Sequence, residues 1–352
     1  MTADDGRRRN DAAAPGHDVP TGADGEQPGP AGGGTVQPVL ADEGTTSVPE
    51  PEPRPKADAT AEVAVINKPT AIGFVAPALG LIGVFMMFPA VWALYLGLTN
   101  YRVTGTAARE PEFVGTDNFT RALEDPLFTS SLWITLIFMA FSGVVGQMGL
   151  GFTLAWLFRR WRGWTRRTIE VLVIMSWIIP GSVVAFLWRA FLDGEGGTLN
   201  ALIPGDVTTE WLLRQPLLAI IVFNIWRGTA FAMLLFDAAL NTLPPSHLET
   251  AKVSGASTWQ TLRDIVFPAV RGHMLTTALL VSMWTFNLFT PFLLTGGGPN
   301  YQTEVLAIYV YRVGFGQGDF GFGSAVSAVM LVINLIIALV YFRVLRDRRK
   351  KA

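Results

Sequence analysis

Two of the most apolar stretches of this chain contain polar and aromatic side chains that an apolar environment would leave unsatisfied. They are Asn224, Trp226, Arg227 and Asp237 in the run 217–240, and Trp284, Asn287 and Thr290 in the run 274–294. Amide and guanidinium groups form several hydrogen bonds each, and indole rings offer flat apolar faces. This mixture suits a hydroxyl-rich ring such as a sugar. The alternative is that Trp226 packs in a core and Asn287 joins two helices by a hydrogen bond worth ~0.6 kcal/mol in a membrane.

A second informative group lies in the polar segment PSHLETAKVSGASTWQTLRDIVFP, residues 245–268. Two pairs of residues have the spacing of a capping box, which satisfies free amide groups at a helix start: Ser246 with Glu249, and Ser257 with Gln260. Gly255 lies between the pairs and permits a left-handed turn. We expect Pro268 to close the unit. The pattern predicts a hairpin of two short helices.

The elements that must position these residues are hydrophobic helices. Half of the 352 residues are hydrophobic and 16% are charged. Apolar runs of roughly 20 residues, the length that crosses ~30 Å of hydrocarbon, occur at 71–98, 132–158, 169–192, 217–240, 274–294 and 321–341. We predict an all-α, polytopic membrane bundle of six transmembrane helices, with the hairpin between the fourth and the fifth.

The distribution of basic residues predicts the domain order and the orientation. Lys and Arg are concentrated at 159–167, in the loop 242–271, and from Arg343 to the end. Cytoplasmic connections carry such an excess, so we expect both termini to be cytoplasmic. The polar residues 1–67 are predicted to form a disordered extension. The transmembrane domain is predicted at 68–346, and a basic tail at 347–352, next to anionic lipid rather than nucleic acid.

Composition excludes several kinds of chemistry. The chain has no cysteine, which excludes disulfides, thiolate metal ligands and cysteine catalysis. It also lacks the GxxxxGK motif followed by Ser or Thr, the glycine-rich cradle that binds nucleotide phosphates. We therefore expect no catalytic residue, no metal site and no bound cofactor, and any use of ATP must lie on another chain.

The polar segment resembles the signature of a known family, the integral-membrane permease subunits of binding-protein-dependent ABC importers. That signature is EAA, three residues, Gly, nine residues, then Ile, any residue, Leu and Pro. The matching positions here are Glu249, Thr250, Ala251, Gly255, Ala256, Ile265 and Pro268. The departures, which put details of the coupling surface and of the fourth helix's kink in doubt, are Thr250 for alanine, Ser254 for aspartate, Phe267 for leucine and Ala230 for proline.

The resemblance covers residues 72–346 and is closest in pattern to permeases of the maltose and glycerol-phosphate transport type. The segments FVGTDNFTRAL, WRGTAF, LLTGGGP and YRVGFGQGDFGFGSA are similar to that subgroup. In that family the loop is a coupling helix that docks on an ATPase subunit. The resemblance therefore assigns ATPase coupling to Glu249, Thr250, Ala251, Gly255, Ala256 and Pro268.

Sugar contacts in that subgroup come from a Trp-x-Gly stretch of the fourth span and a turn of the fifth. The matching residues, with Arg227 added for its chemistry, are Trp226, Arg227, Gly228, Phe231, Phe286 and Asn287. The resemblance implies an importer of an oligosaccharide or disaccharide in the bacterial plasma membrane. It also implies four partners: a second permease subunit forming a heterodimer, two ATP-binding subunits, an extracytoplasmic solute-binding protein and membrane lipids.

Three alternatives stay open at this point. In the first, the solute is glycerol phosphate or another polyol phosphate, and Arg227 binds the anion. In the second, the chain is an ATP-independent transporter or channel, for which an inverted repeat and mid-membrane carboxylates are typical. In the third, the chain is a membrane scaffold that transports nothing, which leaves the hairpin without a function.

Overall fold

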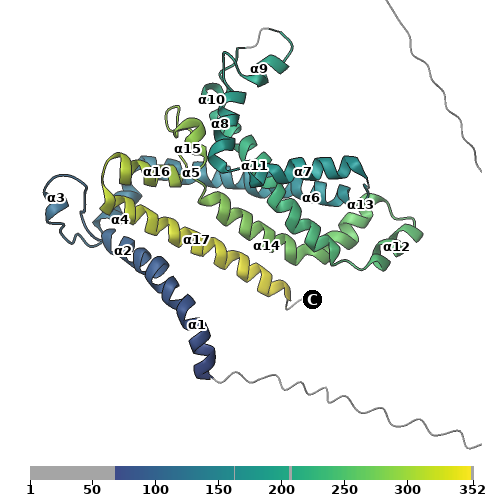
Figure 1. The fold of residues 1–352 in the computed structure, drawn as a ribbon, viewed down its shortest axis with the longest axis horizontal. Coiled ribbons are helices and arrows are strands. Elements are labelled where there is room, and N and C mark those ends of the chain that lie inside the picture. Colours follow the sequence, from purple (N-terminus) through teal and green to yellow (C-terminus); the bar gives the residue numbers. More distant parts are fainter. Residues whose placement is uncertain (1–67, 162, 206–207, 350–352) are drawn as a thin grey trace, which may run out of the picture. The chain divides into compact units, whose positions relative to one another are not determined.

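The structure, a computed structural model, describes residues 68–161, 163–205 and 208–349. Within these ranges every regular element is a helix, apart from an isolated β-bridge between Thr99 and Phe113. The predicted all-α class is therefore confirmed for the described part of the chain (Figure 1). The predicted extension 1–67 lies outside the described residues, as do residues 350–352 of the predicted tail.

Five helical rods among the described residues are long and apolar enough to cross a membrane. Three of them are continuous helices with a π-helical turn inside. The five are α1–η1–α2 (Lys68–Ile82, Gly83–Met87, Phe88–Leu96), α5–η2–α6 (Pro126–Phe138, Met139–Gln147, Met148–Phe158), α11 (Pro216–Asn241), α13–η3–α14 (Thr258–Thr261, Leu262–Val266, Phe267–Phe286) and α17 (Phe320–Arg349).

The predicted third span, 169–192, is wrong as a continuous helix. The structure has α7 (Trp164–Ile178) and α8 (Gly181–Phe191), which meet at an angle of 108°. Pro180 causes the break because proline has no amide hydrogen to donate and forces the residue before it out of the helical region. Ile179 has an extended backbone, with ψ of 133°. If the bent pair counts as one span, the described part of the chain has six spans, the number that was predicted.

The predicted fifth span, 274–294, has the wrong bounds at both ends. Its rod begins with α13 at Thr258 and ends at Phe286, and a separate short helix, α15 (Pro291–Thr295), follows after a break. Pro291 starts α15, where its missing amide hydrogen is not needed. Asn287 therefore ends α14, where it hydrogen-bonds Asn334, and Thr290 precedes α15, where its hydroxyl accepts from Arg227.

Short helices lie between the long rods in the sequence. They are α3 (Thr106–Arg109), α4 (Asp117–Glu124), α9 (Thr198–Leu202), α10 (Trp211–Arg214), α12 (Pro245–Val253) and α16 (Leu306–Tyr311), with a π-helical turn η4 (Arg312–Gly316). We name the end that carries α12 the hairpin end, and the end that carries α4, α15 and α16 the far end (Figure 1).

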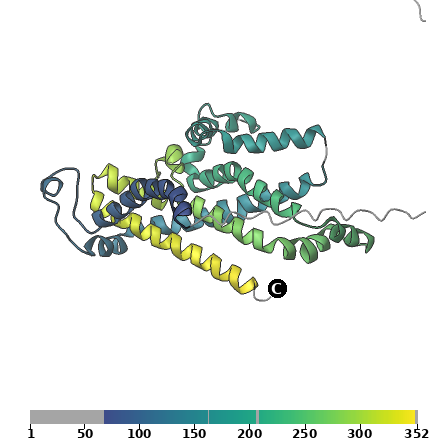
Figure 2. The same cartoon turned by 60° about the horizontal axis from the view of Figure 1, so that its bottom comes forward.

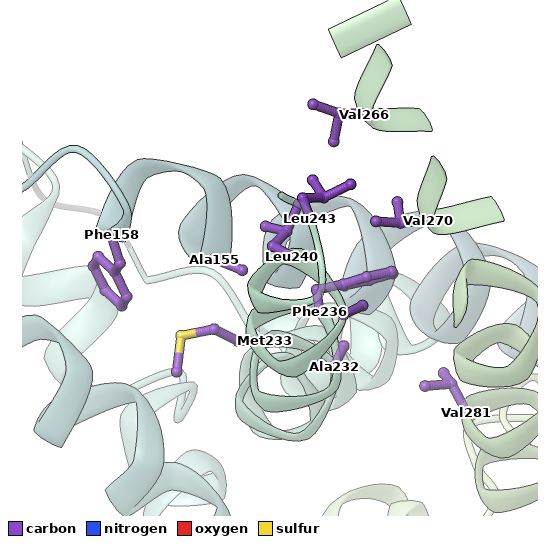
Figure 3. Close-up of a cluster of buried hydrophobic side chains, with 11 residues drawn as sticks. Ala155, Phe158, Ala232, Met233, Phe236, Leu240, Leu243, Val266, Val270 and Val281 are labelled. Carbon is purple, nitrogen blue, oxygen red and sulfur yellow. The ribbon is translucent and has the colours of Figure 1, made fainter. Parts of the chain in front are cut away.

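The central helix of the bundle is α11, which packs against α6, α7 and α14. A Cβ added to Gly151 of α6 would lie 2.7 Å from the Ala232 side chain, so these two helices approach as closely as small residues permit. Figure 3 shows the apolar cluster around α11, to which the η3–α14 rod contributes Val266, Val270 and Val281. Both views show α17 running beside α14 (Figures 1 and 2).

Buried ion pairs hold the far end together. Asp319, just before α17, accepts hydrogen bonds from Arg102 at 2.7 Å and from Arg121 of α4 at 3.0 Å. Glu304, which is 1% exposed, pairs with Arg312 through two hydrogen bonds. Charges removed from water need such partners, because the loss of hydration otherwise disfavours the folded state.

The same end shows perturbed ionisation. Burial opposes the ionisation of Asp319, but hydrogen bonds from Arg121, Arg102 and the Phe322 amide outweigh it, so the pKa of this carboxyl lies below its usual value. Burial and the 2.6 Å hydrogen bond that the Tyr309 hydroxyl donates to Asp125 together raise the pKa of Tyr309. Ion pairs and a hydrogen bond to a carboxylate thus hold the connections at the far end in place.

Candidate functional site

The predicted hairpin is present, but its two arms are capped differently. Ser257 accepts a hydrogen bond from the Gln260 amide, and the Gln260 side chain accepts one from the Ser257 amide, so this capping box is confirmed. The box predicted for Ser246 and Glu249 is wrong. Pro244 is the N-cap of α12 and Pro245 its first residue, and no side chain caps it, because the two prolines begin the helix before Ser246.

A left-handed glycine turns the chain between the arms. Gly255 has φ of +72°, a region that residues with a Cβ enter at a cost of about 1–2 kcal/mol. The Ala256 amide then donates to the Ala251 carbonyl at 3.0 Å, which closes the end of α12. Ala251 is only 5% exposed, so its close packing is within this chain, while Ala256 is half-buried.

The face of α12 that points away from the bundle is exposed and contains an acidic residue. Glu249 and Thr250 are exposed, and no hydrogen bond or ion pair of the Glu249 carboxylate occurs within the described ranges. Val253 is 89% exposed and Trp259 is 63% exposed on the same hairpin. Sequence reasoning missed these two, although an apolar residue in an otherwise polar loop is a usable signal. Exposed apolar groups of this kind mark contact surfaces.

The second arm of the hairpin continues directly into a membrane span. Pro268 was predicted to close the unit, and this is wrong, because helix runs without interruption from Thr258 to Phe286. The π-helical turn η3 precedes the proline, and the Phe267 amide donates to the Leu262 carbonyl across it. A π turn alters the hydrogen-bond register by one residue, which accommodates a residue without an amide hydrogen. A displacement of the hairpin therefore moves the span itself.

Gly228 of α11 faces another helix rather than an open path. A Cβ at this position would collide with the side chain of Gln147 from η2. The Gln147 amide donates to the Asn224 carbonyl at 2.9 Å, and the Asn224 amide donates to the Ser142 hydroxyl at 2.7 Å. These buried residues form a polar contact between two spans, so Gly228 permits that contact and Asn224 is satisfied within the chain.

Aromatic side chains gather where the third span is broken. The ring of Trp177, at the end of α7, stacks on Phe231 with centroids 5.1 Å apart and lies 5.2 Å from the ring of Trp284. Trp284 is 51% exposed and Trp226 is 42% exposed, so both rings keep open faces. Sequence reasoning missed Trp177, because the break at Pro180 brings it to α11 and this cannot be read from an apolar run.

Arg227 reaches the same break. Its Nη1 lies 3.4 Å from the Thr290 hydroxyl, and a Cβ added to Gly181 would lie 2.7 Å from Nη2. Its Nε is buried and has no partner within the described ranges. Asp237, ten residues along the helix, hydrogen-bonds Asn241 instead. Arg227 is therefore a half-buried guanidinium at the break between α7 and α8, without a carboxylate partner within the described ranges.

The two predicted residues at the end of α14 differ. Phe286 is fully buried in a cluster with Leu306 and Phe322, so it packs as a core residue in this structure, and its contact with solute stays a prediction. Asn287 is exposed but pairs with Asn334 of α17 through two hydrogen bonds of 3.0 and 3.1 Å. Both hydrogens of its amide are used, and its oxygen accepts from the Asn334 amide, so each polar atom of the Asn287 side chain has a partner within the chain.

A cavity of about 670 Å³ opens at the far end, between α8, α10 and α15. Its lining combines charged residues with aromatic and glycine residues, among them Phe186, Arg189, Asp193, Glu210, Phe292 and Gly296. The cavity is large enough to admit a solute of disaccharide size, since small-molecule sites occupy ~300–1,000 Å³.

The sequence is similar to a family described as "Binding-protein-dependent transport system inner membrane component", which matches residues 147–350. It is 30% identical to the inner membrane ABC transporter permease protein YcjO of Escherichia coli, over 78% of this chain and 93% of that protein. Identity to the trehalose/maltose transport system permease protein MalF of Thermococcus litoralis is 28%, over 78% and 92%. Identity to the sn-glycerol-3-phosphate transport system permease protein UgpA of Agrobacterium fabrum is 30%, over 80% and 96%.

The fold is similar to that of a solved structure, a chain of a bacterial ABC transporter that imports the acidic polysaccharide alginate. The TM-score is 0.68 at 21% identity, and the match covers 79% of this chain and 95% of that one. At this identity the likeness concerns the fold, and it agrees with the bundle of spans described above.

Proposed function

The chain belongs to the family of binding-protein-dependent transport system inner membrane components and is a permease subunit of an ABC importer; from this premise we propose that it carries a sugar and is driven by ATPases on separate chains. The hairpin is the observation that carries the proposal. It presents an unpaired carboxylate, Glu249, on a capped turn whose second arm is continuous with a span. A rigid helix transmits displacement as a body, whereas a flexible loop absorbs it.

In this proposal α12 docks on an ATPase subunit through Glu249, Thr250 and Val253, which its exposed face presents. Gly255 sets the angle between the arms, while Ala251 and Ala256 hold α12 against its own chain. Pro268, inside the rod, lies where the hairpin motion enters the span. Closure of the ATPases then rocks the bundle between its inward-facing and outward-facing states.

We infer that the working assembly contains further subunits. The hydrophobic window of the first span buries none of its residues inside this chain, which supports contact with lipid and with a second, similar permease subunit. Two ATP-binding subunits supply the free energy. An extracytoplasmic binding protein delivers solute to the far end, where the cavity beside α8 opens.

The sidedness follows from charge. Basic residues follow α6, occupy the hairpin and end α17: Arg159, Arg160, Lys252 and Arg343. Cytoplasmic connections carry such an excess of positive charge, which supports a cytoplasmic hairpin end with both termini on that side. The far end then faces outward, in the plasma membrane of a bacterium. ATPase subunits dock on the cytoplasmic side, as the coupling role of the hairpin requires.

The proposed solute is a carbohydrate, an oligosaccharide or disaccharide. Its support is two sets of aromatic rings near the break in the third span: Trp284 with the stacked pair Trp177–Phe231, and Trp226, whose ring lies 5.7 Å from that of Trp188. Arg227 reaches the same break. Asn287, which is exposed, contributes the second lone pair of its amide oxygen, because the Asn334 amide uses only one. Gly228 and Phe286 have structural roles in this proposal. The relative from Thermococcus litoralis, which is named for trehalose and maltose, favours the same solute class.

A polyol phosphate is the second candidate, because Arg227 has no carboxylate partner within the described ranges and a relative is named for glycerol phosphate. Competition for ATP-driven uptake between unlabelled maltose-type sugars and glycerol phosphate separates the two. Arg227→Gln should weaken uptake of an anion far more than that of a neutral sugar. Competition by glycerol phosphate alone, lost in that variant, would replace the sugar proposal.

A further inference from the structure

A second cavity, of about 290 Å³, lies at the hairpin end between the end of α6 and the hairpin. Its walls come from two elements that are far apart in sequence. The residues that matter are Trp156, Arg159 and Arg160 from the end of α6, and Lys252, Thr258 and Thr261 from the hairpin. Because the hairpin supplies five of the eight lining residues and the end of α6 supplies the other three, a ligand in this cavity would bridge the hairpin to the second span.

The cavity contains three cations and no acidic residue. None of Arg159, Arg160 and Lys252 forms an ion pair within the described ranges, whereas Arg166 pairs with Glu170 and Arg263 with Asp264 nearby. Arg159 donates to the Leu240 carbonyl, and Arg160 donates to the Thr258 hydroxyl at 3.3 Å and lies over the Trp156 ring. These contacts orient the guanidinium groups but do not neutralise them.

The chemistry of the lining selects an oxyanion. Two guanidinium groups lie on one wall, and the Lys252 ammonium and the Thr258 hydroxyl lie on the other. Such groups bind phosphate oxygens by hydrogen bonds, which are charge-assisted for the cations. The Thr261 hydroxyl already donates to the Ser257 carbonyl. Arg159 is half-buried, and Arg160 and Lys252 are exposed, so the cavity is reached from outside.

The position of the cavity points to a phosphate on a lipid. It lies at the end of a membrane-spanning rod, and three exposed tryptophans accompany it: Trp161, 42% exposed, Trp164, 80% exposed, and Trp259, 63% exposed. Tryptophan is enriched at the level of lipid headgroups. Trp161 directly follows Arg160, and Trp259 directly follows Thr258.

We propose that this cavity binds the phosphate of an anionic phospholipid headgroup and thereby links the position of the hairpin to the composition of the membrane. The bound phosphate joins Arg159 and Arg160 on the second span to Lys252 on the hairpin. The inference concerns a ligand other than the transported solute, so it stands or falls independently of the sugar proposal.

The test is native mass spectrometry of the assembled importer titrated with phosphatidylglycerol, with phosphatidylcholine as the zwitterionic comparison. The double variant Arg160→Gln and Lys252→Gln changes only exposed side chains, so it should fold. Arg167→Gln is the matched control, an exposed arginine at the same end that does not line the cavity. We expect the double variant to lose about 30-fold in affinity for phosphatidylglycerol, roughly fivefold for each cation near an anionic group.

Three results decide the matter. Selective binding of phosphatidylglycerol that the double variant loses and Arg167→Gln keeps supports the proposal. If millimolar inorganic phosphate displaces that lipid from the wild type, the phosphate site stands and soluble phosphate competes for it. Equal binding of both lipids, or equal binding by wild type and double variant, overturns it and leaves an acidic protein segment as the occupant to seek.

Discussion

The two ends of the bundle differ in how their charged side chains are buried and paired. The far end buries its charges: Asp319 is 3% exposed and Glu304 is 1% exposed, and each is held by arginine. The hairpin end exposes its charges and leaves Glu249 and Lys252 without ion pairs within the described ranges. A buried, paired network resists motion, whereas an exposed surface with unpaired groups is available for partners. In the proposed mechanism the far end stays fixed and the ATPases displace the hairpin end.

Rigidity is nevertheless present in the hairpin, and it comes from the backbone. A capping box at Ser257, a left-handed Gly255 and the helix that continues through Pro268 fix its shape without burial. The far end is rigid through side-chain charge. Substitutions at the two ends should therefore differ in what they damage, stability at one and coupling at the other.

The largest effect on stability should follow from breaking a buried ion pair at the far end. Arg312→Met leaves Glu304 buried without its partner, which costs about 3–5 kcal/mol. Arg263→Met removes an ion pair from the hairpin end, where Arg263 is fully exposed, and should not change stability measurably. Thermal unfolding of the two purified variants measures the contrast. Equal losses would erase the proposed difference between the ends.

A smaller effect, on coupling rather than on overall stability, is expected at the hairpin turn. Gly255→Ala places a Cβ at φ of +72°, a strain of about 1–2 kcal/mol, and should lower ATP-driven uptake several-fold with little change in melting temperature. Gly272→Ala is the matched control, since nothing lies within 4 Å of that Cβ and its φ is not positive. Uptake that is unchanged by Gly255→Ala would show that the turn geometry is not used.

The break in the third span offers a test of the solute path. Gly181→Ala puts a Cβ 2.7 Å from Nη2 of Arg227 and should displace this guanidinium, raising the KM for uptake roughly fivefold, or about 1 kcal/mol. Gly149→Ala on α6 has no neighbour within 4 Å and should leave KM unchanged. Equal KM values in both variants would remove Arg227 from the path.

Acid should lower the free energy of unfolding through Asp319 at the far end. Because the pKa of Asp319 is lower in the folded protein than in the unfolded chain, its contribution to stability is complete above the unfolded value of ~3.9 and is lost as pH falls through the folded value. Melting temperature should fall below about pH 4, and Asp319→Asn should be less stable at neutral pH and depend less on acid. A variant with the wild-type acid profile would assign the effect to other carboxyl groups.

The spans could be predicted because a bilayer demands a length of apolar sequence, and hydropathy measures that length. Hydropathy failed to locate the helix breaks at Pro180 and after Asn287. Apolar residues flank both breaks, so the apolar run continues where the helix does not. The two capping boxes have the same spacing in the sequence, yet only the one at Ser257 formed, because Pro244 and Pro245 had already started the other helix.

The site was predictable only as far as residue type decides it. Glu249 is exposed on the hairpin and Gly255 forms the left-handed turn that the pattern indicated, while the roles of both residues and of Trp226 stay predictions. The burial of Phe286, the contact of Gly228 with Gln147 and the stacking of Trp177 on Phe231 depend on which helices become neighbours. A single sequence does not show directly which helices pack against one another.

The most direct test of the account is solute uptake by vesicles that contain the assembled importer, with ATP supplied to the ATPase side. We predict uptake only when the ATPase subunits are present, and a loss of more than about tenfold for Glu249→Ala in a complex that still assembles, because a buried charge contact at an interface contributes 2 kcal/mol or more. Equal uptake without the ATPase subunits, or full uptake by Glu249→Ala, would contradict it.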